Sequence, residues 1–343
     1  MSNSPYKGIP FHQHFGRLTP TLNIADIRLP ALNPFVISKS TKIASLGSCF
    51  AQHIAQYLIT NEYRYDFFEH PEHNEALENL ETFRQFSARY GNIYTPKQAL
   101  DLTLEALGRK EIRKVPWEWK GKWIDALRPG VFNTGAESVD QVFESRASHL
   151  TAVKKILLET DVFVFTLGLT ESWVHTPTDS ALPMAPGVRG GHFDSKIYHF
   201  ENFSFFDTYA AMVDLIKTIR SVNPGSKFIV TVSPVPLQAT YENNNVIAAS
   251  IQSKSVLRSV AGEILKTFTD VSYFPSYELI TNHLNQGRYF AENLRDINSS
   301  GVKLVMRNFE QNYNPRVSHQ SSTSELNLNR QLSKVICDED FIL

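Results

Sequence analysis

The sequence predicts an α/β protein, a three-layer α/β/α sandwich built on a mostly parallel sheet. Short apolar runs alternate along the chain with helical segments of a dozen or more residues, as in strands joined by crossover helices. The run at 161–168 is apolar almost throughout, which is typical of a strand buried on both faces. With 343 residues, 42% of them hydrophobic, the chain is long enough to bury a large core.

The first part of the chain predicts a strand at 41–47 and helices at 50–61, 75–90 and 95–108. The last of these has the clearest ends, because Thr95 suits an N-cap, Pro96 the first helical position and Gly108 a stop. Residues 109–135 carry three tryptophans and two prolines, and they predict an ordered, lid-like insertion.

The alternation of strands and helices continues to residue 309. It predicts helices at 137–160, 208–225, 247–268 and 299–309, with strands at 161–168, 227–235 and 271–280. Residues 174–204 are rich in glycine and proline and predict a second lid-like excursion. We therefore divide the chain into a wrapping segment at 1–40, a catalytic domain at 41–312 and a tail at 313–343.

Composition and charge exclude several classes of protein. The net charge of −1 provides no basic field for nucleic acid or an anionic membrane. The N-terminal stretch lacks a signal-like apolar region, and no run reaches the roughly 18 apolar residues of a membrane span, so we expect a cytoplasmic protein. The two cysteines, Cys49 and Cys337, have neither disulfide nor zinc spacing, so no metal is expected and Cys337 is expected to be inert.

Residues 42–58 suggest a catalytic turn. The apolar run at 43–46 reaches Gly47, and Ser48 and Cys49 then precede a helical segment. A nucleophile on a strand-to-helix turn projects from the edge of the sheet, where unpaired helix N–H groups can stabilise an oxyanion. The same triplet also fits a plain turn in which Gly47 bends the chain, Ser48 caps the helix and Cys49 packs.

The wider sequence resembles a known family. LGSCFAQHIA is similar to the motif that gives the GSCFA family its name, and that family is placed in the SGNH (GDSL-like) hydrolase superfamily. Further strings resemble the family in the same order: FSARYGNIYTPKQALDL, HLTAVKKILLETDVFVFTLGLTESW, VTVSPVPLQAT, SKSVLR, YFPSYELI and GRYFAENLRDINSSGVKLVMRNF. The resemblance covers most of residues 40–310 and implies an SGNH hydrolase-like, flavodoxin-like fold.

The resemblance implies roles for residues near the turn. SGNH enzymes carry their nucleophilic serine in a Gly-Asp-Ser block, which pairs Gly47 with the glycine, Ser48 with the aspartate and Cys49 with the serine. Their oxyanion donors include a glycine in a second block. Gly91 is the best match for that glycine, with Asn92 beside it.

Two later blocks depart from the superfamily pattern. The third block, Gly-x-Asn-Asp, falls on residues 168–171, where Thr170 replaces the asparagine and Glu171 the acid. The late block, Asp-x-x-His, supplies the general base, and Asn293 to Asp296 has its spacing but no histidine. Either another residue accepts the proton, or the protein is not a hydrolase of that mechanism.

We expect His199 to replace the missing base. It lies on the 174–204 excursion, which can bring an imidazole over the strand ends to Cys49, and histidine titrates near neutral pH. His192 is the second choice, and His53 lies one helical turn after Cys49. Glu171 can orient a base or donate a proton. Each also fits a structural role, as a backbone-bonded loop histidine or a helix-end carboxylate.

The sequence supports two functions. The first is an acyl-transfer enzyme, an O-acyltransferase or esterase, in which Cys49 attacks an acyl carbonyl and a carbohydrate or glycan is the substrate. Lys254 would bind a charged group, and tryptophans such as Trp173 would stack on a sugar. No cofactor is required, although acetyl-CoA can serve as acyl donor by analogy. The second function is a non-catalytic ligand-binding or glycan-binding protein that keeps the pocket but lacks the base.

Overall fold

The computed structural model describes residues 4–19, 22–71, 77–315 and 337–342. Its centre is an all-parallel sheet with the strand order β1-β4-β8-β9. These strands are β1 (Ile43–Gly47), β4 (Val162–Leu167), β8 (Lys227–Val232) and β9 (Val271–Phe274). Strands β1, β4 and β8 are parallel neighbours. Their carboxyl ends therefore meet at one edge of the sheet.

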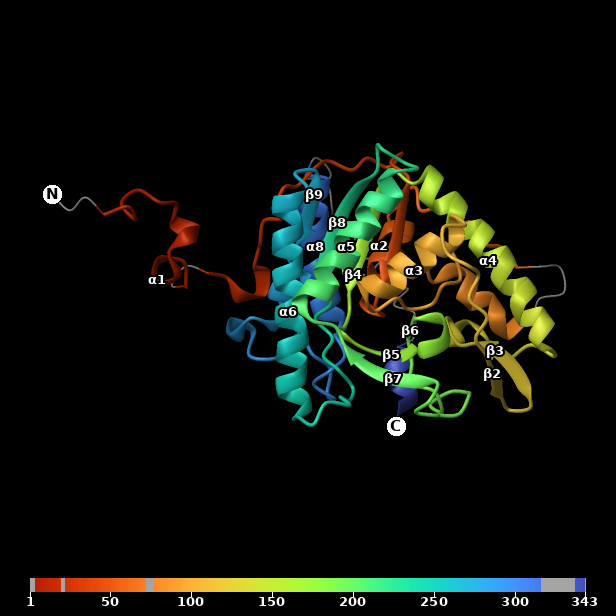
Figure 1. The fold of residues 1–343 in the computed structure, drawn as a ribbon. Coiled ribbons are helices and arrows are strands. Elements are labelled where there is room, and N and C mark those ends of the chain that lie inside the picture. Colours follow the sequence, from red (N-terminus) through yellow and green to blue (C-terminus); the bar gives the residue numbers. More distant parts are fainter. Residues whose placement is uncertain (1–3, 20–21, 72–76, 316–336, 343) are drawn as a thin grey trace.

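Helices cover both faces of this sheet, so the predicted three-layer α/β/α sandwich is confirmed (Figure 1). One layer contains α3 (Pro96–Ala106), α4 (Val139–Glu159), α5 (Phe205–Arg220) and α6 (Val246–Thr267). The other contains α2 (Phe50–Thr60), α7 (Ser276–Thr281) and α8 (Ser299–Tyr313).

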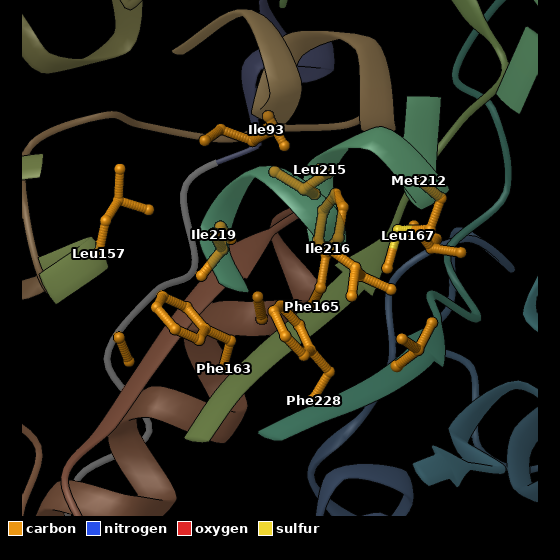
Figure 2. Close-up of a cluster of buried hydrophobic side chains, with 14 of the residues drawn as sticks. Ile93, Leu157, Phe163, Phe165, Leu167, Met212, Leu215, Ile216, Ile219 and Phe228 are labelled. Atoms are coloured by element: carbon orange, nitrogen blue, oxygen red, sulfur yellow. The ribbon is translucent and has the colours of Figure 1, made fainter. Parts of the chain in front are cut away.

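The core on the α5 side shows how the strand pattern produces the layers. Side chains alternate along β4, so Phe163 and Phe165 face α5 whereas Val164 faces α8. Phe163 stacks on Phe228 of β8 with ring centroids 5.4 Å apart, and Figure 2 shows both beneath the apolar side of α5. Because both faces of β4 are buried, its sequence is apolar without alternation.

The two excursions contain strands of their own. The first holds the hairpin β2 (Pro116–Trp119) and β3 (Lys122–Asp125). The second contributes to an antiparallel sheet, with the strand order β6-β5-β7, formed by β5 (Glu171–His175), β6 (Ser180–Leu182) and β7 (Tyr198–Asn202). In Figure 1 this small sheet lies beyond the carboxyl ends of the main strands. The glycines and prolines of 174–204 therefore mark turns between short strands.

The predicted helix at 75–90 is wrong over its described part. Leu77–Arg84 is a 3-10 helix, and no α-helix follows it before α3. Backbone groups of this stretch bond to a neighbouring segment instead: Phe68 N–H donates to Ser87 O, and Arg89 N–H donates to a carboxylate oxygen of Glu69. Other short elements are η1 (Phe11–Gln13), α1 (Phe15–Leu18), η3 (Ile24–Asp26), η5 (Pro129–Val131), η6 (Thr176–Thr178), η7 (His283–Asn285) and η8 (Asp338–Ile342).

A buried ionic network ties the first excursion to the main domain. Arg146 of α4 bonds to Glu105 of α3 and, at 3.0 Å, to Asp125 of β3. Asp125 also accepts from Arg128 at 3.1 Å. Burial raises the pKa of Asp125, but the two arginines and hydrogen bonds lower it overall, so it stays ionised. The hairpin is thus held by charge pairs that water does not reach.

The N-terminal segment has two parts. Ile27, Ala31 and Ile37 are buried, and Asn308 and Asn312 of α8 bind the backbone of this stretch through their side-chain amides. Residues 4–19 extend away from the sheet in Figure 1. Among the described residues, no helix combines the length and apolar character needed to cross a membrane.

Candidate functional site

The turn between β1 and α2 depends on Gly47. Its φ is +140°, and a Cβ at this position would lie 2.4 Å from the backbone oxygen of Thr166 on β4. Only glycine fits such a contact. Ser48 N–H then donates to the same oxygen at 3.1 Å, which holds the turn against the end of β4.

Cys49, rather than Ser48, occupies the N-cap position of α2. Within the described part of the chain, the N–H groups of Cys49 and Phe50 and the buried hydroxyl of Ser48 have no hydrogen-bond partner. Ser48 therefore does not cap the helix, whereas Gly47 bends the chain and Cys49 is buried, as the plain-turn alternative also expected. Unpaired N–H groups at a helix start are the arrangement that can stabilise an oxyanion.

The segment after Gly91 lies between the ends of β1 and β4. Gly91 has φ +68°, and Ile93 N–H donates to Gly47 O at 2.8 Å. Gly168, which follows β4, donates its N–H to Tyr94 O at 2.9 Å. This insertion buries Asn92 beside α2, where its amide oxygen accepts from Gln52 at 3.1 Å. Gly91 therefore shapes the turn that brings the Asn92 amide to the strand ends.

Thr170 and Glu171 of the third block bond to neighbouring segments rather than to Cys49. The hydroxyl of Thr170 donates to Asn202 Oδ1 at 2.7 Å, so its proton is committed to a structural bond. Glu171 accepts from the hydroxyl of Thr240 at 2.7 Å and from Tyr241 N–H at 3.3 Å. Partial burial raises the pKa of the Glu171 carboxyl.

None of the three candidate histidines contacts the thiol of Cys49. His199 lies on β7, with its side chain 49% exposed; its Nδ1 bonds to the Thr176 hydroxyl at 2.9 Å, and its Nε2 lies 3.9 Å from a carboxylate oxygen of Glu201. His199 therefore bonds to Thr176 and not to Cys49, because the excursion folds as a sheet that turns this side chain outward. His192 is exposed. Burial lowers the pKa of His53 to about 4, and its ring packs edge-on against Phe50.

The thiol of Cys49 instead lies near Cys337 of the C-terminal segment, and both residues belong to one buried cluster. Its interaction with the Cys337 thiol and its burial raise the pKa of Cys49 well above its ordinary value. The same interaction and the nearby guanidinium of Arg295 lower the pKa of Cys337. Arg295 Nη2 donates to Cys337 Sγ at 3.5 Å, and the hydroxyl of Tyr94 lies 3.6 Å from it. Cys337, which we expected to be inert, is therefore part of the site.

Lys254 of α6 is the buried cation of the site. Its side chain is 3% exposed and donates to Gly168 O at 2.6 Å. Burial lowers the pKa of Lys254 to about 8, and its charge interacts with Glu339 and Cys49. A lysine with such a pKa carries a substantial neutral fraction near neutral pH and can accept a proton.

The two acidic residues after Cys337 also enter the site. Asp338 Oδ2 accepts from the amide of Asn92 at 2.9 Å, and burial raises the pKa of Asp338 to about 6. Glu339 accepts from Arg295 at 2.7 Å and from Gln238 N–H at 3.1 Å. The C-terminal segment therefore binds the amide that the sequence assigned to the oxyanion site.

An open pocket of about 310 Å³, which we call the aromatic hollow, lies on one side of this segment. Trp173, Phe200 and Tyr241 form part of its wall, and the rings of Trp173 and Tyr241 are 4.8 Å apart. Glu171 and Glu339 add carboxylates to the same wall. Rings beside hydrogen-bond acceptors suit a flat group that carries hydroxyls.

A second pocket of about 630 Å³, which we call the cationic hollow, lies close to the first. Lys254 and Arg295 line it together with apolar side chains such as Ile247 and Ile251. The ion pair of Arg295 with Glu339 joins the wall of this pocket to the wall of the aromatic hollow. Both hollows are therefore bounded by side chains that act on Cys49.

A family model of GSCFA proteins matches residues 42–309, which include the glycine turn, the Asn92 segment, Lys254 and Arg295. The chain belongs to the GSCFA family. Comparison with curated proteins and with solved structures found no match. Cys337, Asp338 and Glu339 lie outside the matched GSCFA region, yet Cys337 lies near Cys49, Asp338 binds Asn92 and Glu339 pairs with Arg295.

Several residues of this GSCFA site were not predicted. Arg295 stands within the late block that lacks histidine, and its position there was the only available signal. Tyr94 and Gln52 lie inside sequence strings that resemble the family, but no pattern there distinguishes them from neighbouring residues. Within the described ranges, no three His, Cys, Asp or Glu side chains are grouped so that they could hold a metal ion.

Proposed function

We propose that this GSCFA protein is an acyl-transfer enzyme of the SGNH superfamily, an O-acyltransferase or esterase that acts on a carbohydrate or glycan. The observation that carries the proposal is the position of Cys49: it starts α2 at the end of β1, beside unpaired N–H groups and near Glu339 and Arg295, which line the two hollows. Its free thiol suits a reducing, cytoplasmic compartment.

The chemistry would proceed through a thioester. The sulfur of Cys49 attacks the acyl carbonyl, and the tetrahedral oxyanion is held by the N–H groups of Cys49 and Phe50, with the Asn92 amide as a further donor. The donor's leaving group departs with a proton. A sugar hydroxyl, or water in an esterase, then attacks the thioester and regenerates the thiol.

Lys254 is our candidate for the proton acceptor in place of a late-block histidine. Its burial and its pKa of about 8 give it the neutral fraction that a base needs, and its charge interacts with the Cys49 sulfur. Removal of a general base typically costs about 10²-fold or more in rate. We therefore expect the rate of Cys49 acylation to fall by at least that factor in Lys254→Met.

The two hollows suit two different substrates. A sugar ring can stack on Trp173 or Tyr241 in the aromatic hollow while Glu171 accepts its hydroxyls. The cationic hollow, with Lys254 and Arg295 beside apolar side chains, suits an acyl donor that carries an anionic group. Acetyl-CoA is such a donor, and its assignment rests on analogy with SGNH acetyltransferases.

Intact mass spectrometry tests the proposal. The reduced protein is incubated with acetyl-CoA or p-nitrophenyl acetate, and an acetyl adduct is expected on the wild-type chain and on Cys337→Ala but not on Cys49→Ala. Ser48→Ala is the matched control, because it removes the neighbouring hydroxyl and leaves the thiol. An adduct that survives Cys49→Ala and disappears in Ser48→Ala would assign the nucleophile to Ser48 instead.

A non-catalytic binding protein is the second candidate. The observations that favour it are the raised pKa of Cys49 and the absence of an imidazole among its contacts in the described part of the chain. Titration calorimetry with oligosaccharides separates the two. Sugar binding that is lost in Trp173→Ala, without an adduct from either acyl donor, would support the binder and contradict the enzyme.

A further inference from the structure

The C-terminal segment fills the site with three consecutive side chains, and we call residues 337–339 the C-terminal plug. Cys337 lies near Cys49 in one buried cluster, Asp338 binds Asn92, and Glu339 pairs with Arg295. The plug also fits closely, because a Cβ added to Gly130 would lie 2.5 Å from Asp338 Oδ1. Cys49 is 5% exposed with the plug in place. An acyl group therefore reaches the thiol only while the plug moves aside, and acylation of the wild-type chain requires that movement.

We propose that Cys49 and Cys337 form a redox pair, which a small peroxide converts into a disulfide that fixes the plug over the nucleophile. The pair itself is independent of the proposed function. Only its consequence, the reversible loss of acyl transfer, depends on Cys49 being the nucleophile.

The contacts of Cys337 identify it as the thiol that reacts first. Arg295 donates to its sulfur, and the hydroxyl of Tyr94 lies within hydrogen-bond distance of it. Both contacts favour a thiolate, which is the form that attacks a peroxide. Glu339, 3.8 Å from the same sulfur, opposes the negative charge but is itself paired with Arg295. Cys49 belongs to the same buried cluster as Cys337 and can act as the resolving thiol.

The reaction balances with one peroxide molecule. The Cys337 thiolate attacks one oxygen of hydrogen peroxide, the O–O bond breaks, and Cys337 becomes a sulfenic acid while hydroxide leaves. The sulfur of Cys49 then attacks the sulfenic sulfur, the S–O bond breaks, and the disulfide forms. The two thiols lose two electrons and two protons in all, and the peroxide becomes two molecules of water. A thiol reductant reverses the step.

The burial of both sulfurs selects the oxidant by size. Cys49 and Cys337 are each 5% exposed, so a bulky disulfide cannot align with either sulfur unless the plug leaves first. Hydrogen peroxide is close to water in size and needs no such opening. A disulfide that forms faster with peroxide than with oxidised glutathione would agree with this arrangement.

The experiment starts from the fully reduced, full-length protein and adds stoichiometric hydrogen peroxide. Intact mass spectrometry should show the loss of two hydrogen atoms, and a non-reducing peptide map should show the Cys49 peptide linked to the Cys337 peptide. Dithiothreitol should reverse both changes. Cys337→Ser and Cys49→Ser should each give no linked peptide, and their melting temperatures report whether they fold.

Arg295→Gln provides a variant that keeps both thiols. It removes the charge that supports the Cys337 thiolate, so the disulfide should form at least severalfold more slowly. The proposal is overturned if peroxide leaves only sulfenic or sulfinic acid on separate cysteines, or if both thiols stay reduced. A disulfide that forms in a protein without any acyl adduct would refute the proposed function but not the redox pair.

Discussion

Replacement of Lys254 by methionine tests whether the buried ammonium, our candidate base, lowers the stability of the folded protein. Methionine keeps an unbranched side chain, one atom shorter than that of lysine, and removes the charge. Burial lowers the pKa of Lys254 from 10.5 to about 8. A tenfold change in proton affinity is worth roughly 1.4 kcal/mol, so the folded state loses about 3 kcal/mol when it holds this ammonium at neutral pH.

The sign of the pH dependence follows from linkage. Because the folded pKa lies below that of the unfolded chain, the unfolded state binds more protons between about pH 8 and about pH 10.5. The wild-type protein therefore gains stability relative to Lys254→Met as the pH rises through this window. Below this window the wild-type protein carries the full cost of its buried ammonium. The variant avoids that cost, but it leaves Gly168 O without its hydrogen bond, which costs about 1–3 kcal/mol. At neutral pH we expect the variant to be between equally stable and about 2 kcal/mol more stable.

Urea unfolding of both proteins between about pH 7 and about pH 10.5 measures this difference. The groups that face the ammonium are Glu339, Arg295, Cys49 and Cys337, and the two thiols are themselves shifted, with the pKa of Cys49 raised and that of Cys337 lowered. The comparison is therefore repeated with Cys49→Ser and Cys337→Ser in both proteins. A stability difference that does not change with pH would refute the buried, weakly basic ammonium. If Cys49 is fully acylated in Lys254→Met, Lys254 is not the base.

Two further predictions concern the scaffold, and denaturant unfolding checks both. Gly47→Ala should destabilise the fold by about 4 kcal/mol or prevent folding, because its Cβ would meet the backbone of β4, whereas Gly121→Ala, at φ +74° in open space, should cost only about 1 kcal/mol. Equal costs would contradict the close contact. Arg146→Met should cost about 3–5 kcal/mol, because Glu105 and Asp125 stay buried without their shared partner. A cost below about 1 kcal/mol would mean that water reaches the network.

The sequence by itself determined the layered architecture and the turn. Continuous apolar character marked β4 as a strand with two buried faces, and helices between the strands required a parallel sheet. Local capping was equally readable: Thr95 and Gln98 form the capping box that starts α3. Gly47 was predicted as the bend, since a strand that enters a helix directly needs backbone angles that only glycine adopts there. These features depend on neighbours along the chain.

The tertiary structure alone decided the surroundings of the thiol. Nothing in the pattern near residue 337 indicates that this segment returns to Cys49, because contacts between distant segments depend on where the whole chain packs. The position of His199 shows the same limit: pairing of β5 with β7 turns its ring toward Thr176, and one residue of strand register decides which face it occupies. Lys254 became a candidate base only through its burial beneath Gly168, which its own sequence string could not reveal. Local pattern thus located the turn that carries Cys49, whereas long-range packing decided which groups surround its thiol.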